Sequence, residues 1–125
     1  MKLLATQTDE ASLAAFGEEA RALLMRHDYS GLAVRFGYAL AYDRPLAAAI
    51  ERDFLSAAKS PRAFVSEAHR PVVVSYFAPN ETGLLALVEC TVPVADGAVV
   101  LLELIVGGRG EEKHITVEDI SGAAA

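Results

Sequence analysis

The period of the apolar pattern changes near residue 61, and this change constrains the fold more than any other feature of the sequence. Before that point, apolar residues recur every three or four positions, which is typical of amphipathic helices. After it, they alternate or run continuously between turn residues, which is typical of strands. Helices followed by a series of strands indicate an α+β fold in which the helices cover one face of an antiparallel sheet.

The first helix is expected to begin at Thr8, because threonine is a residue type that caps helix N-termini. Its apolar stripe consists of Leu13, Phe16, Ala20, Leu23 and Leu24. Asp28 marks the predicted end of this helix. A short second helix over about residues 29–36 would then bury Leu32 and Phe36, which stand four positions apart.

The stretch FGYALAYDRP (36–45) interrupts this helical half and allows two readings. Tyr38 and Tyr42 alternate with alanines, which favours a short strand. The alternative is that the second helix continues through the stretch, since alanine favours helix. Asp43 supports the strand, because a carboxylate followed closely by Pro45 is typical of a helix start. The apolar stripe of that third helix consists of Leu46, Ile50 and Phe54.

Five strands are predicted after this point: RAFVSEAH, VVVSYFA, LLALVECTVPV, AVVLLELIV and KHITVEDI. The 125 residues suit one domain with a single core. We therefore expect one domain over 1–125, with helices over about 8–58, strands over about 62–119 and a loose tail at 121–125.

The Asp96-Gly97 pair between two apolar runs is the strongest hairpin signal in the chain. A two-residue turn there pairs Ala95 with Ala98 and, counting back along both strands, Cys90 with Glu103. A one-residue bulge, which the proline of the first run could signal, would exchange the two faces beyond it.

With the unbulged register, both faces of this hairpin are apolar, although helices can cover only one of them. A large uncovered apolar patch is rare on a monomer. The sequence therefore predicts a two-fold homodimer packed sheet against sheet. The expected contact residues are Leu85, Leu87, Val100, Leu102 and Leu104.

Charge and composition argue against several classes of partner. The net charge of −6 does not favour binding to nucleic acid or to an anionic membrane surface. No apolar run reaches membrane-spanning length, and the three-residue run near the N-terminus is too short for a signal peptide, so a cytoplasmic location is expected. The three histidines lie far apart and no phosphate-binding glycine loop is present, so we expect neither a metal nor a cofactor.

Two carboxylates interrupt apolar strands and are candidates for a site. Burying an unpaired carboxylate is costly, so Glu89 and Glu103 are expected to be paired, neutralised or exposed to a cavity. Glu103 is the stronger pocket candidate, and a buried salt bridge or a position near the sheet edge is the alternative. Cys90, the single cysteine, is expected to be inert packing.

The segments HDYSGLAVRF and DRPLAAAIERDF resemble the second helix and the strand-to-third-helix junction of the nuclear-transport-factor / ketosteroid-isomerase-like superfamily (cystatin-like fold, SnoaL-type). The resemblance implies a cone, in which a curved antiparallel sheet wraps around the N-terminal helices. It implies a general base at Asp43 and a protonated acid at Glu103, with Ala20 standing where isomerase members have a tyrosine. The pocket that it implies would be lined by Phe16, Ala20, Tyr38, Tyr42, Phe54, Val88 and Cys90.

Three functions remain open at this point. The first is a homodimeric domain that binds a small, mostly apolar molecule inside the cone. The second is an isomerase or dehydratase in which Asp43 takes a proton and Glu103 donates a hydrogen bond to the developing oxyanion. The third is a dimerisation or interaction module whose interior is filled by side chains.

Overall fold

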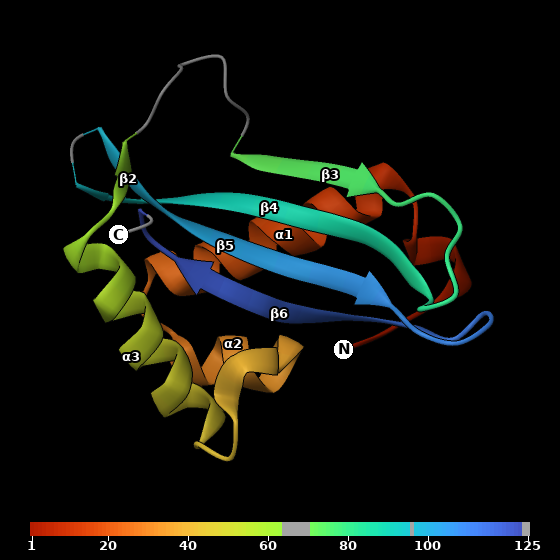
Figure 1. The fold of residues 1–125 in the computed structure, drawn as a ribbon, viewed down its shortest axis with the longest axis horizontal. Coiled ribbons are helices and arrows are strands. Elements are labelled where there is room, and N and C mark those ends of the chain that lie inside the picture. Colours follow the sequence, from red (N-terminus) through yellow and green to blue (C-terminus); the bar gives the residue numbers. More distant parts are fainter. Residues whose placement is uncertain (64–70, 96, 124–125) are drawn as a thin grey trace.

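The computed structural model describes residues 1–63, 71–95 and 97–123, and it has an α+β fold, as the sequence predicted (Figure 1). The helices are α1 (Glu10–Met25), α2 (Tyr29–Phe36) and α3 (Leu46–Lys59), with short 3-10 turns η1 (Ala5–Gln7) and η2 (Ala39–Ala41). The strands are β1 (Lys2–Leu3), β2 (Arg62–Ala63), β3 (Val72–Tyr76), β4 (Leu84–Ala95), β5 (Ala98–Gly107) and β6 (Lys113–Ser121).

The six strands form one curved antiparallel sheet in the order β1-β6-β5-β4-β3, and β2 pairs with the start of β5 (Figure 1). The helices pack against a single face of this sheet, with α1 under β3 and β4 and with α2 and α3 beside β6. We call this helix-covered side the inner face and the opposite side the outer face. Strand β1 was not anticipated from the sequence, since two residues give no periodicity.

The first two helices begin at aspartates. Asp9, and not Thr8 as predicted, caps α1 by accepting hydrogen bonds from the Ser12 backbone N–H (3.1 Å) and the Ser12 hydroxyl (2.6 Å). Asp28 caps α2 by accepting from the Gly31 N–H (2.9 Å). The predicted bounds of α2 are confirmed, and Leu32 and Phe36 are buried.

The stretch 36–45 contains neither the predicted strand nor a continuous helix. The helix α2 ends at Phe36, and Gly37 leaves it with a positive φ of 76°. Tyr38 forms one isolated parallel bridge to Val117 of β6, after which the chain turns through η2. Asp43 is exposed with φ 67° and does not cap α3, which begins only after Pro45.

The β4–β5 hairpin pairs Ala95 with Ala98 as predicted, but a bulge lies between Pro93 and Ala95. The bulge shifts the register beyond it, so Cys90 pairs with Leu102 and not with Glu103. The faces of β5 are therefore exchanged relative to the unbulged prediction. The predicted contact residues Val100, Leu102 and Leu104 lie in the core, whereas the outer face carries Val73, Leu87, Glu89, Leu101, Glu103 and Ile105.

The core lies between α1 and the inner face, and the two layers approach closely at Gly17. A Cβ atom at that position would lie 2.7 Å from a Val72 methyl and 2.8 Å from a Val88 methyl. Glycine is therefore required by the distance between helix and sheet and not by its backbone angles. None of the described helices combines the length and the apolar surface that crossing a bilayer requires.

Candidate functional site

An open groove of about 400 Å³ runs along the edge of β6, between the end of that strand, α3 and the turn η2. It is the candidate functional site because polar residues of β6, of α3 and of the segment before η2 line it together. Its lining consists of Tyr38, Leu40, Asp53, Ser56, Ala57, Ser60, Asp119, Ile120, Ser121, Gly122 and Ala123.

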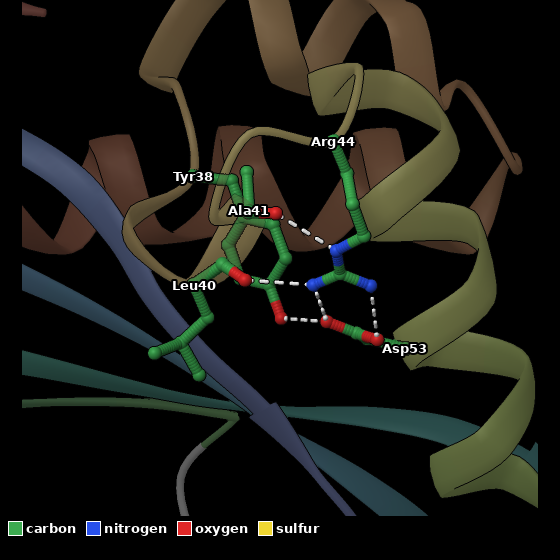
Figure 2. Close-up of polar contacts among 5 residues, drawn as sticks. All are labelled: Tyr38, Leu40, Ala41, Arg44 and Asp53. Atoms are coloured by element: carbon green, nitrogen blue, oxygen red, sulfur yellow. Dashed lines mark hydrogen bonds and ion pairs between the residues drawn. The ribbon is translucent and has the colours of Figure 1, made fainter.

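One wall of the groove is fixed by a network around Arg44 (Figure 2). The guanidinium forms a bidentate pair with Asp53 of α3, with N–O distances of 3.0 and 3.1 Å. It also donates to the carbonyl oxygens of Leu40 (2.7 Å) and Ala41 (2.8 Å). The Tyr38 hydroxyl donates to the same Asp53 carboxylate over 2.5 Å. Such bidentate, charge-assisted contacts hold the turn firmly against α3.

The network sets the protonation state of its members. The hydrogen bonds from Arg44 hold the pKa of Asp53 below its usual range against the opposing effect of burial, and the Tyr38 hydroxyl adds to this effect. Burial raises the pKa of Tyr38, and its bond to Asp53 raises it further. The groove therefore presents an ionised carboxylate and a neutral phenol at neutral pH.

The opposite wall is the end of β6 and the residues that follow it. The Ala123 N–H donates to the Ser60 carbonyl oxygen (2.6 Å), which closes the C-terminal end of α3. Gly122 permits this approach, because a Cβ atom there would collide with the carbonyl oxygens of Ser60 and Ala57. Asp119 and Ser121 add a carboxylate and a hydroxyl to this wall.

Most of the pocket residues that the resemblance implied are packed in the core. Ala20, Val88 and Cys90 have no exposed surface, and Phe54 is 4% exposed. The Cys90 sulfur lies 3.5 Å from the Gly17 carbonyl oxygen, and burial raises the pKa of its thiol to about 12. The thiol therefore stays protonated, which agrees with its expected role as inert packing.

The remaining expected residues do not meet in one cavity. Phe16 packs against the rim of the core, whereas Tyr42 is 76% exposed. Asp43 lies in an exposed turn before α3, and Glu103 lies on the outer face in the middle of β5. Only Tyr38 of the expected pocket residues lines the groove.

Glu103 belongs instead to a row of carboxylates across three strands. It lies directly opposite Glu89 of β4 and Asp119 of β6. Burial raises the pKa of Glu103, and the neighbouring charges of Asp119 and Glu89 raise it further, whereas Arg62 opposes the shift. Like charges placed opposite one another destabilise a sheet, so this row is costly to the fold.

Arg44 and Asp53 were missed as site residues. The sequence contained one signal for this pair. Asp53 stands next to Phe54, which belongs to the buried stripe of α3, and a partly buried carboxylate needs a partner. In the described part of the chain, no group of three or more histidine, cysteine, aspartate or glutamate side chains is placed to hold a metal ion.

Comparison of the chain with protein-family models, with curated proteins and with solved structures found no match. The geometry of the groove and of the sheet is therefore the basis for assigning a function.

Proposed function

We propose that this chain is a homodimeric domain that binds a small molecule, and that it is a cone-shaped member of the nuclear-transport-factor / ketosteroid-isomerase-like superfamily. Three helices followed by an antiparallel meander, with all three helices on the inner face of a curved sheet, support this reading. The segments that carry the resemblance form α2 and the start of α3.

The groove beside β6 is the proposed binding site, and the Arg44–Asp53–Tyr38 network is the observation that carries this assignment. Binding sites need polar groups that are held in place before the ligand arrives. Asp53 is held by three hydrogen bonds, and the turn that bears Tyr38 is held by the same arginine. The volume of about 400 Å³ lies within the range that small-molecule sites occupy.

The lining favours a ligand rich in hydrogen-bonding groups over the mostly apolar ligand expected from the sequence. Three serines, two aspartates and Tyr38 line the groove, together with the apolar residues Leu40, Ala57, Ile120 and Ala123. The expected apolar pocket positions Ala20, Val88 and Cys90 are occupied by tight packing.

Catalysis by Asp43 and Glu103 is not part of this proposal. A base and an oxyanion-stabilising acid must both reach one substrate. Asp43 and Glu103 lie on separate elements, and neither lines the groove.

Self-association through the outer face is the second part of the proposal. None of the described helices covers this face, where Val73, Leu87, Leu101 and Ile105 remain partly exposed. Pairing two such faces would remove these apolar side chains from water, which favours association, whereas the carboxylates of Glu89 and Glu103 on the same face oppose it. The interaction-module reading rests on this face alone and requires no ligand.

The binding proposal is tested by a fragment screen followed by amide chemical shifts. Ser56→Leu places a larger side chain in the groove at an exposed position of α3, and Ala48→Leu makes the same kind of change elsewhere on that helix. We expect polar fragments that shift the amides of Tyr38 and Ser121 to bind the wild type and Ala48→Leu but not Ser56→Leu. Binding that survives Ser56→Leu, or shifts confined to other surfaces, would contradict the assignment.

A further inference from the structure

A smaller hollow of about 270 Å³ lies on the other side of the β4–β5 hairpin, at the edge of β4. The strand β3 begins at Val72, opposite Cys90, so the later residues of β4 have no strand beyond them on this side within the described chain. Small and proline side chains leave the space open. The lining consists of Arg21, Pro71, Thr91, Pro93, Ala95, Gly97, Ala98 and Val99.

Arg21 of α1 supplies the one cationic group among these lining residues. Its Nε donates to the Thr91 carbonyl oxygen over 2.6 Å, at the point where β4 loses its neighbour. Its Nη1 lies 3.9 Å from a Glu18 carboxylate oxygen, which is beyond hydrogen-bonding distance. Within the described residues, the terminal N–H groups of Arg21 therefore make no hydrogen bond.

The terminal nitrogens of Arg21 have only a weak partner within the described residues. The Arg21 side chain is 20% exposed and lies against apolar walls, where a charge keeps little of its hydration. The pair with Glu18, whose side chain is 55% exposed, is a surface pair that contributes little and can be displaced. A carboxylate in the hollow would match the planar fork of the guanidinium.

We infer that this hollow binds a small monocarboxylate with a short apolar tail. The carboxylate pairs with the terminal nitrogens of Arg21, and the tail packs against Pro93 and Val99. One guanidinium matches the single charge of a carboxylate, whereas a phosphate or sulfate dianion would need further donors. The volume lies just below the lower end, about 300 Å³, of sites for drug-sized ligands, so the ligand is small.

Hexanoate is a suitable probe, and hexanamide is its uncharged counterpart of the same shape. Calorimetry measures the affinities, and the amide shifts of Thr91 and Val99 locate the site. Arg21→Gln removes the charge, while Arg35→Gln removes a matched charge from an exposed arginine of α2 that pairs with Glu19. Ala98→Leu fills the hollow and leaves Arg21 in place, which provides a second test if Arg21→Gln does not fold.

We expect hexanoate to bind the wild type at least about tenfold more tightly than hexanamide, a difference of about 1.4 kcal/mol. This preference should vanish in Arg21→Gln and persist in Arg35→Gln, and Ala98→Leu should weaken both ligands. Equal affinities, a preference that survives Arg21→Gln, or no shift at Thr91 and Val99 at millimolar hexanoate would overturn the inference. Because the hollow shares no residue with the β6 groove, these outcomes are independent of the binding proposal made for that groove.

Discussion

Arg44 uses four N–H contacts to organise the segment between α2 and α3. Two go to the Asp53 carboxylate and two go to the carbonyl oxygens of Leu40 and Ala41, which a strand would have paired with a neighbour. The planar fork of arginine makes this combination available, whereas a lysine could not reach the same geometry. Arg44 thus satisfies the carbonyl groups that the turn in YALAYD leaves without a strand partner.

At the residue scale, Glu103 should make the free energy of unfolding depend on pH. Its pKa is higher in the folded protein than in the unfolded chain, so folding is opposed as the pH rises through the interval between these two values. Glu103→Gln removes this opposition and relieves the like-charge contacts with Glu89 and Asp119. We expect the variant to be more stable at pH 7 by about 0.2–1 kcal/mol, the usual range for cross-strand pairs.

Thermal unfolding at two pH values measures the effect of Glu103→Gln. The gain should disappear near about pH 3, well below the ordinary glutamate pKa, where the carboxyl is protonated in both states. Glu111→Gln, at an exposed turn position, controls for the change in net charge. A gain of the same size in Glu111→Gln, or a gain that persists at low pH, would refute the explanation.

At the scale of elements, the turn residues and the helical periodicity gave accurate predictions, whereas the register predicted for β4 and β5 was wrong. The Asp-Gly hairpin and the bounds of α2 followed from local sequence, because each depends on residues that are close along the chain. The bulge beside Pro93 adds one residue whose effect reaches every later position of β5. Proline signalled the bulge, but only tertiary packing decides whether a strand bulges or ends there.

The candidate site was less predictable than the fold for the same physical reason. Tyr38 was expected in a pocket and lines the groove, but Arg44 and Asp53 meet across a turn whose path the sequence did not define. Glu103 was expected to be paired, neutralised or exposed to a cavity, and in the structure its cross-strand neighbours are the carboxylates Glu89 and Asp119. Long-range register, which local patterns do not encode, determined the neighbours of Glu103, whereas the path of the turn before α3 brought Arg44 to Asp53.

The close contact between α1 and the sheet at Gly17 should make the stability of the protein sensitive to any side chain at this position. Gly17→Ala places a methyl group within 3 Å of Val72 and Val88, which typically costs about 1–3 kcal/mol. The higher helix propensity of alanine returns at most about 1 kcal/mol. We expect a net destabilisation of about 1 kcal/mol in urea unfolding.

A double-mutant cycle identifies the cause of the Gly17→Ala effect. In a Val88→Ala background one of the two close methyl contacts is removed and the contact with Val72 remains, so Gly17→Ala should then cost less than in the wild type. Equal costs in both backgrounds would mean that the clash with Val88 is not responsible.

For the whole molecule, self-association through the outer face is the property to measure. We expect a dimer at micromolar concentration in sedimentation velocity. Leu101→Glu should shift it to a monomer, because it places a charge among the partly exposed apolar residues of the outer face. Leu55→Glu, at a position of α3 that is 47% exposed, should remain a dimer. A wild-type monomer, or dissociation by Leu55→Glu as well, would contradict pairing through the outer face.

The two edges of the sheet differ, and this difference limits how far copies can add to one another. The edge of β6 is occupied by β1 near its start and by the bridge from Tyr38 in its middle, and the open groove flanks its end, whereas β3 has no described strand beyond it (Figure 1). Growth of a fibre by edge-to-edge strand pairing needs two unpaired edge strands on every unit. Each protomer offers one such edge within the described residues, β3, so a β3-to-β3 contact would close this edge on both protomers that make it.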